Sequence, residues 1–221
     1  MKTIRSINPY SGEKNGEVEL FSAEKLTEII DTAHSAFESW KNTSFEQRKK
    51  LFYALAENIE KDIDECARLQ TVEMGMLLSD SKAGLQSTAN LIRWFADNAQ
   101  NILGEKEFET SEGFKGMQMH DPLGVIFGIA PWNFPFNQLL RAAVPNMLAG
   151  NTQIYKHASN VPLCAQKIED LFIASGFPKG VYTNLFMSSS LSEHIISNPK
   201  IAGVNLTGGE RAGSAVGALA G

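Results

Sequence analysis

Cysteine is scarce in this sequence, and the cysteines present are far apart. Two of the 221 residues are cysteines, Cys66 and Cys164, and neither belongs to a Cys-x-x-Cys pair. This spacing argues against a disulfide framework and against the common zinc sites, and it favours a reducing, cytoplasmic compartment. The four histidines are also scattered without metal-ligand spacing. We therefore expect no bound metal.

Long apolar runs and clustered positive charge are missing as well. No run of apolar residues reaches the roughly 18 that span a membrane, and the polar N-terminus MKTIRSINPYSGEKNG has no apolar signal-peptide core. The net charge is -5, with 20 Lys and Arg against 25 Asp and Glu. Nucleic-acid phosphates are bound by clustered Lys and Arg. We therefore expect neither a membrane nor a nucleic acid among the partners of the chain.

The first part of the chain has a helical pattern. Apolar residues recur at helical spacing over 23–40, over one stripe that ends at Cys66, and over 85–99. The stretch from Ser44 to Gln47 is a capping-box pattern, which predicts where the second helix begins. Residues 104–123 are polar and contain glycine, and they predict an extended, projecting segment.

From residue 124 short apolar runs alternate with amphipathic stretches. The pattern predicts strands over 125–130, 152–155, 181–187 and 203–206, with helices over 137–148, 162–174, 191–196 and 211–220. Such alternation is typical of a parallel, Rossmann-like α/β sheet flanked by helices, whose ligands bind at the carboxyl ends of the strands. We expect three parts: a helical part over 1–103, a bridging segment over 104–123, and a nucleotide-binding part over 124–221.

A stiff segment follows the first predicted strand. In IAPWNFPF, Pro131 and Pro135 bracket Trp132, Asn133 and Phe134. Because proline fixes its own φ and cannot donate to a sheet, the strand must end here. An asparagine amide held rigidly at this point could donate to an oxyanion that develops during a reaction. Alternatively, Asn133 is a turn residue that caps the following helix.

Lys156 and Ser159 follow the second predicted strand, and each has both a ligand-binding and a purely structural interpretation. Lys156 could hydrogen-bond ribose hydroxyls or a phosphate, or it is a solvated lysine at the start of a loop. A carboxylate at the position of Ser159 would accept bonds from a ribose 2′-hydroxyl and repel a 2′-phosphate, whereas serine leaves room for the phosphate. Ser159 could equally be a helix N-cap before Pro162.

Two further features bear on ligand binding. Gly208 and Gly209 separate the last predicted strand from the last helix, where glycine permits close approach and a helix N-terminus favours anions. The stretch GGERAG matches no standard phosphate-binding pattern, so a tight turn is the alternative. Arg141 lies eight residues after Asn133, near a whole number of helical turns. It could pair with a substrate carboxylate, or it is a surface or interhelix arginine.

Together these motifs resemble the NAD(P)-dependent aldehyde dehydrogenases. The resemblance runs along essentially the whole chain and rests on INPYSGE, DPLGVI, PWNFP, YKHAS and LTGGERAG, in that order. The stretches YKHASNVPLCAQ and NQLLRAAVPNMLAGN are most similar to the succinate-semialdehyde dehydrogenase branch.

The resemblance implies a role for each candidate residue. Asn133 matches the asparagine of the oxyanion hole, and Arg141 matches an arginine that grips the substrate carboxylate. The nicotinamide-ribose channel would be lined by Ile129, Ala130, Pro131 and Trp132. The adenosine and pyrophosphate contacts would come from Lys156, His157, Ala158, Ser159, Gly208 and Gly209. Many members carry proline at the position of His157. NAD-preferring members carry glutamate at the position of Ser159, so the resemblance favours NADP over NAD.

The resemblance also implies that part of such an enzyme is absent. Family members are considerably longer, and their nucleophilic cysteine and general-base glutamate follow the motif that contains Gly208 and Gly209. Neither Cys66 nor Cys164 matches that nucleophile. We expect the N-terminal part of an enzyme that oxidises succinate semialdehyde or a similar aldehyde with NAD(P)+, a homo-oligomer in its full-length form, and we expect this chain alone to be inactive. The alternative is a non-catalytic, nucleotide-binding or oligomer-forming subunit.

Overall fold

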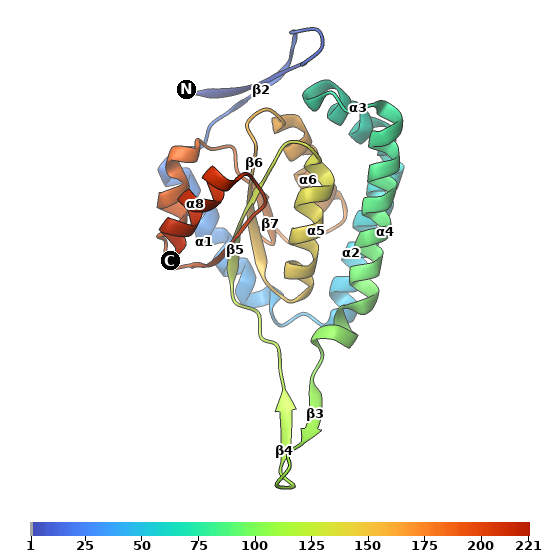
Figure 1. Ribbon diagram of the computed structural model, residues 1–221, viewed down its shortest axis with the longest axis vertical. Coiled ribbons are helices and arrows are strands. Elements are labelled where there is room, and N and C mark those ends of the chain that lie inside the picture. Colours follow the sequence, from blue (N-terminus) through green and yellow to red (C-terminus); the bar gives the residue numbers. More distant parts are fainter. Residues whose placement is uncertain (1) are drawn as a thin grey trace.

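The computed structural model describes residues 2–221 and contains a central parallel sheet. Its strands, in the order in which they pair, are β7 (Tyr182–Asn184), β6 (Thr152–His157), β5 (Val125–Ala130) and β8 (Ile201–Leu206). One face is covered by α1 (Ala23–Trp40), α7 (Ser192–Ile196) and α8 (Glu210–Ala220), and the other by α5 (Pro135–Leu148) and α6 (Pro162–Ala174) (Figure 1). The predicted Rossmann-like α/β sheet is confirmed.

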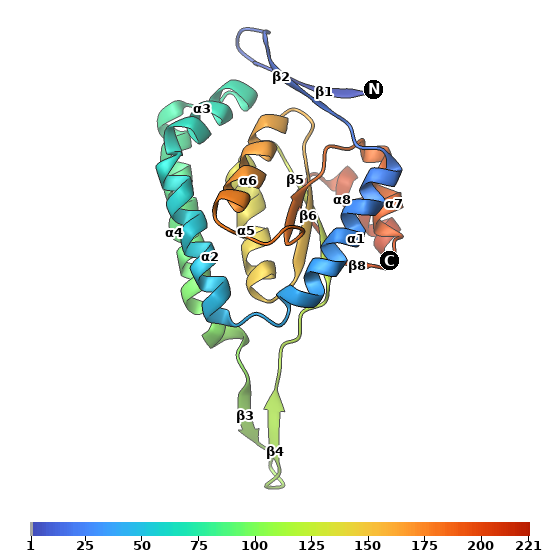
Figure 2. The ribbon, with the colours of Figure 1, turned by 180° about the vertical axis from the view of Figure 1, so that it is seen from behind.

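An outer helical layer packs on α5 and α6. It contains α2 (Phe45–Lys61), α3 (Ile63–Met74) and α4 (Leu78–Leu103) (Figure 2). The predicted capping box is present, because Ser44 Oγ accepts from Gln47 N at 3.2 Å and Gln47 Oε1 accepts from Ser44 N at 2.8 Å. The prediction of one helix through Cys66 is wrong. The chain leaves the helix at Asp62, whose carboxylate binds Lys167 of α6 at 2.8 Å, and α3 then starts in a new direction.

The N-terminal residues form a hairpin that the helical prediction missed. Strands β1 (Thr3–Ile7) and β2 (Lys14–Glu19) pair antiparallel. Their side chains form no apolar face, so hydrophobic periodicity carried no signal there. Backbone pairing holds the hairpin instead, and Asn15 ties it to α3 by donating to Val72 O at 2.8 Å.

A second hairpin projects from the opposite end of the molecule (Figure 1). Its strands, β3 (Lys106–Glu109) and β4 (Lys115–Gln118), lie within the segment predicted to be extended. The side chains of Phe108, Phe114 and Met117 are at least half exposed on it. Within residues 2–221, no helix has both the length and the apolar character that crossing a membrane requires.

Two buried charges hold helix ends in place. Arg48 is 4% exposed and donates to carbonyls at the end of α1 and to Leu148 O at the end of α5, the latter at 2.7 Å. Glu73 is 2% exposed, and its carboxylate accepts from Leu163 N at 2.9 Å and from Cys164 N at 2.7 Å, in the first turn of α6. Helix ends carry unpaired backbone groups, and these side chains satisfy them across the fold. A short 3₁₀ turn, η1 (Ser189–Leu191), completes the structure before α7.

Candidate functional site

Three loops that carry predicted site residues lie side by side at the carboxyl edge of the sheet. Strand β5 lies between β6 and β8, and its last residues pair with theirs in register: Ala130 with His157, and Ile129 with Leu206. The pairing continues past the strands, because Ala158 N donates to Ala130 O at 3.1 Å and Thr207 N to Ile129 O at 3.0 Å. The parallel topology therefore brings the PWNFP, YKHAS and LTGG motifs together.

The loop after β5 presents Asn133 to solvent. Helix α5 begins at Pro135, whose fixed φ suits the first helical position. Phe134 is the N-cap residue and no side chain caps the helix, so the capping role considered for Asn133 is excluded. Asn133 is exposed, and its amide has no hydrogen-bond partner within residues 2–221. Both N–H groups of this amide are free to donate to a ligand.

Lys156 is a buried cation at the end of β6. It is 9% exposed, which excludes the solvated lysine considered above, and its ammonium donates to His157 O at 3.2 Å. Burial lowers the pKa of this ammonium. No carboxylate within the described part of the chain pairs with it. A buried cation without an anionic partner at a strand end is well suited to hold a polar or anionic ligand.

The next three residues differ in what they expose. The His157 ring is 5% exposed, and it lies on the face of β6 that Tyr155 also occupies, with ring centroids 6.5 Å apart. This ring does not reach the open edge, which leaves the His157 backbone as the part available to a cofactor. Ala158 is half-buried and Ser159 is exposed in the turn that follows. The N-cap residue of α6 is Val161, so Ser159 does not cap that helix.

Glycine at 208 and 209 is not required by the turn itself. Neither residue adopts a left-handed φ, and Gly209 has φ −80°. A Cβ added at Gly209 would meet nothing within 4 Å, and one at Gly208 would make an ordinary contact with Leu206 at 3.4 Å. The space that a side chain would fill lies open beside the first turn of α8, which no side chain caps. These residues fit a phosphate group that approaches the backbone closely.

The helix N-termini at this edge are not equivalent. The first turn of α6 is already filled by the Glu73 carboxylate, so a second anion would be repelled there. The first turn of α8 also contains a carboxylate, that of Glu210, but no side chain accepts a hydrogen bond from the backbone N–H groups there. Among these two, α8 is therefore the helix whose N-terminus can accept a phosphate. Sequence reasoning missed Glu73, because no motif relates a residue of α3 to a helix that begins almost 90 positions later.

Arg141 lies away from the motif that was used to position it. It is exposed in the middle of α5 and makes no ion pair or hydrogen bond with residues 2–221. The helix starts at Pro135, so Asn133 is outside it and the whole-turn argument between the two residues does not apply. Six residues of helix place Arg141 roughly 9 Å along the axis from Pro135.

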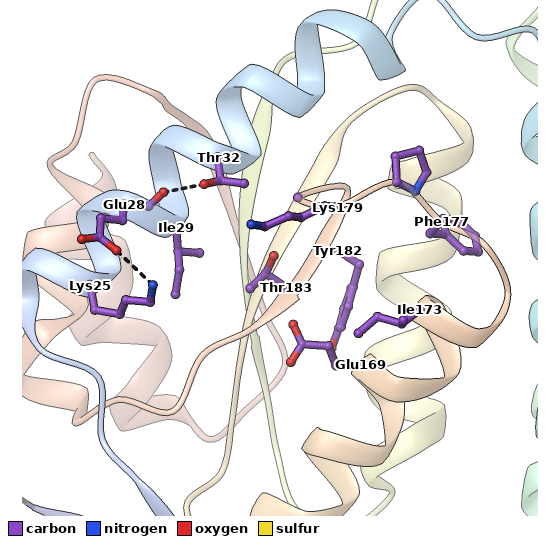
Figure 3. Close-up of a pocket in the computed structure, with 12 residues that line it drawn as sticks. Lys25, Glu28, Ile29, Thr32, Glu169, Ile173, Phe177, Lys179, Tyr182 and Thr183 are labelled. Carbon is purple, nitrogen blue, oxygen red and sulfur yellow. Dashed lines mark hydrogen bonds and ion pairs between the residues drawn. The ribbon is translucent and has the colours of Figure 1, made fainter.

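A cavity of about 560 Å³ lies elsewhere, beside the outer edge of β7 (Figure 3). Side chains from α1, α6 and the loop before β7 line it, among them Ile29, Glu169 and Lys179. Glu169 protects this edge, because its carboxylate accepts from Asn184 N at 3.2 Å. Burial raises the pKa of Glu169. None of the predicted site residues lines this cavity, so we place the functional site at the carboxyl edge.

Comparison with known proteins identifies the family of the chain that carries this sheet edge. The model of the Aldehyde dehydrogenase family matches residues 1–221. The chain belongs to the aldehyde dehydrogenase family. It is 37% identical over 220 residues to a succinate-semialdehyde dehydrogenase (NADP+) of Mycobacterium tuberculosis, covering 99% of this chain and 48% of the relative. It is 36% identical over 220 residues to that of Deinococcus radiodurans, covering 100% of this chain and 46% of the relative.

Solved structures of aldehyde dehydrogenases are also similar to this chain. A succinic semialdehyde dehydrogenase from Streptococcus pyogenes, in complex with NADP+ as the cofactor, superposes with a TM-score of 0.94 and 31% identity. The match covers 98% of this chain and 48% of that one. The chain thus spans about half the length of the curated relatives it matches.

Neither cysteine of this aldehyde dehydrogenase chain is a reactive thiol. Both are buried, Cys66 in α3 and Cys164 in α6. Burial raises the pKa of Cys66 to about 12 and that of Cys164 well above its ordinary value. Because the thiolate is the nucleophilic form, these residues act as small core side chains.

Proposed function

We propose that this chain is the N-terminal, nucleotide-binding part of an aldehyde dehydrogenase that oxidises succinate semialdehyde or a similar aldehyde to the carboxylic acid. The cofactor is NADP+, with NAD+ as the weaker choice. The convergence of a free Asn133 amide, an unpaired buried Lys156 and the uncapped N-terminus of α8 at one sheet edge carries the proposal. The NADP+-dependent relatives named above support it.

Each residue at the edge has a physical task in this proposal. When bound, the nicotinamide group accepts the hydride that leaves the substrate. Lys156 would donate to ribose hydroxyls, and the first-turn N–H groups of α8 would hold the phosphates beside Gly208 and Gly209. Asn133 donates to the substrate oxygen as negative charge accumulates on it, which lowers the barrier. Arg141, which is exposed on α5 away from this edge, would supply a positive charge for the distal carboxylate of the substrate.

Assembly and location also form part of the proposal. The exposed apolar side chains Phe108, Phe114 and Met117 lie on a hairpin that protrudes from the body, where they suit contact with another subunit. We propose that the full-length protein is a homo-oligomer that assembles through this hairpin. Two buried, unpaired cysteines are compatible with a cytoplasmic enzyme.

Equilibrium binding of NADP+ to the 221-residue chain tests the proposal. We expect binding that Lys156→Met weakens at least about tenfold, since one charge-assisted contact contributes ~1.5–3 kcal/mol. The matched control is Lys179→Met, on the exposed loop beside the cavity of Figure 3, which should leave the affinity unchanged. We expect no aldehyde oxidation by this chain, because neither cysteine supplies a thiolate. Absence of NADP+ binding, or equal effects of both variants, would contradict the nucleotide site.

Cofactor choice gives a second prediction. Ser159→Glu should weaken NADP+ binding about tenfold or more and leave NAD+ binding equal or improved, because a carboxylate repels the 2′-phosphate and accepts from a 2′-hydroxyl. Ser159→Gln is the control, since it adds similar volume without charge. Isothermal titration with both nucleotides checks this. A parallel loss for NADP+ and NAD+ in Ser159→Glu would mean that Ser159 is not near the 2′ position.

A further inference from the structure

The cavity beside β7 has the size of a small-molecule site. Its volume is about 560 Å³, within the range of roughly 300–1,000 Å³ that ligand pockets occupy. Three separate parts of the chain build it: α1, the second half of α6, and the loop between α6 and β7 (Figure 3). It lies at a free edge of the sheet, because β6 is the one strand within residues 2–221 that pairs with β7.

A carboxylate without a counterion lines this cavity. Glu169 Oε1 accepts from Asn184 N at 3.2 Å, and the carboxylate forms no ion pair within residues 2–221. The Glu169 side chain is half-buried, and this burial raises its pKa. A partly desolvated carboxylate is stabilised by a cation that reaches it. One wall of the cavity is therefore suited to the ammonium group of a ligand.

A cation without a counterion lines the same cavity. Lys179, on the loop before β7, makes no ion pair or side-chain hydrogen bond with the part of the chain that the structure describes. Glu169 and Lys179 do not pair with each other, although both contribute to the lining. The other two charged residues of the lining, Lys25 and Glu28, are paired at 2.9 Å. Lys179 is therefore the cation that remains available to a carboxylate of a ligand.

Apolar side chains form the walls between these two charges. In the view of Figure 3, the charged ends of Glu169 and Lys179 lie on either side of Thr183, and Ile29 faces them from α1. Ile173 of α6 belongs to the same lining and is 68% exposed, which is high for a large apolar residue. The carbon chain of a ligand would cover part of this apolar surface.

We propose that this cavity binds a small zwitterion, an amino acid whose ammonium group pairs with Glu169 and whose carboxylate pairs with Lys179. Its carbon chain lies against Ile29 and Ile173. A ligand with a single charge satisfies one of the two groups and is repelled by the other, whereas a zwitterion satisfies both. This site is independent of the proposed nucleotide site, because none of the residues predicted to bind the nucleotide lines the cavity.

Isothermal titration of the 221-residue chain with unbranched amino acids tests the site. The probes run from glycine through 4-aminobutyrate to 6-aminohexanoate, so that the distance between the two charges increases in steps. We expect at least one length to bind with a Kd of about 1 mM or lower. The alkylamine and the fatty acid of the same chain length should bind at least about tenfold more weakly, because each lacks one charge-assisted contact.

Two variants remove the charges of the cavity one at a time. Lys179→Met should weaken zwitterion binding about tenfold and leave alkylamine binding unchanged. Glu169→Gln should weaken zwitterion binding by a similar factor and leave fatty-acid binding equal or improved. Glutamine keeps an oxygen that can accept from Asn184 N, so the sheet edge is retained. Arg68→Met is the control, since Arg68 is exposed on α3 and does not line the cavity.

Three results overturn the proposal. They are no zwitterion binding at concentrations up to about 20 mM, a singly charged analogue that binds as tightly as the zwitterion, and equal losses in Arg68→Met and the two cavity variants. Should one cavity variant not fold, the other variant with its matched analogue still decides. Absence of NADP+ binding would contradict the proposed function and leave these titrations unaffected.

Discussion

Replacing Arg48 with methionine should lower the free energy of unfolding by about 4 kcal/mol. The guanidinium is buried and donates to Trp40 O, Lys41 O and Leu148 O, with Thr43 Oγ1 as a fourth acceptor. These carbonyls close α1 and α5, two helices on opposite faces of the sheet. Methionine fills part of the volume but leaves Lys41 O and Leu148 O without donors, whereas Trp40 O still accepts from Thr43 N and Thr43 Oγ1. It also removes a cation from two helix C-termini. Urea unfolding followed by circular dichroism measures the loss.

Arg68 provides the control for this prediction. It is exposed on α3 and makes no ion pair or hydrogen bond within residues 2–221, so Arg68→Met should change stability by less than about 0.5 kcal/mol. Arg48→Lys should fall between the two, because a single ammonium cannot reach acceptors on both helices. A loss of less than about 1 kcal/mol in Arg48→Met would show that the helix ends hold without this residue.

Lowering the pH from 7 to 4.5 should cost about 2–3 kcal/mol of stability through His157 alone. The pKa of His157 is about 4 in the fold and 6.5 when unperturbed. Between these values the unfolded chain binds the extra proton, so stability is present above the unfolded pKa and falls as the pH is lowered. Burial is the main cause, and the Lys156 ammonium is the charged group that adds to it. Backbone groups of Pro131 and Pro135 raise the pKa of His157 by a smaller amount than burial lowers it.

Urea unfolding of His157→Phe at both pH values isolates this contribution. The variant should lose about 2–3 kcal/mol less than the wild type over the same interval, because phenylalanine does not titrate. The carboxylates contribute equally to the pH-dependent loss of stability in the wild type and in His157→Phe. Arg93 lowers the pKa of Glu60 to about 2, so the stability from that pair is lost below pH 4.5, outside the interval. Equal losses in the two proteins would mean that His157 accepts its proton in the folded state.

Short-range signals predicted the elements well. Helix α1 and strand β5 have the predicted bounds, because apolar spacing and the following prolines act on neighbouring residues. The capping box at Ser44 is likewise local and is present. The break at Asp62 was not predicted. Apolar residues keep their helical spacing across it, and the partner that accompanies the break, Lys167, lies on a distant helix.

The candidate site was likewise predicted in part: its residues follow from local sequence, whereas the surroundings of their side chains do not. Sequence motifs named Asn133, Lys156 and the glycine pair, since each follows a predicted strand. The motifs did not predict the environment of the side chains: Lys156 is buried without a carboxylate, and the His157 ring is buried without a hydrogen-bond partner among the described residues. Alternation along a strand sends neighbouring side chains to opposite faces, but which face is covered depends on the helices packed there.

By itself, the sequence determined the α/β class, the positions of the motifs and the family that they resemble, because these depend on residue order and on contacts between near neighbours. Tertiary structure alone decided that the Glu73 carboxylate fills the N-terminus of α6 and that the N-terminus of α8 stays open. It also decided that the Arg48 guanidinium joins two helix ends. These interactions join residues far apart in the chain, and only packing of the whole fold brings their atoms within hydrogen-bond distance.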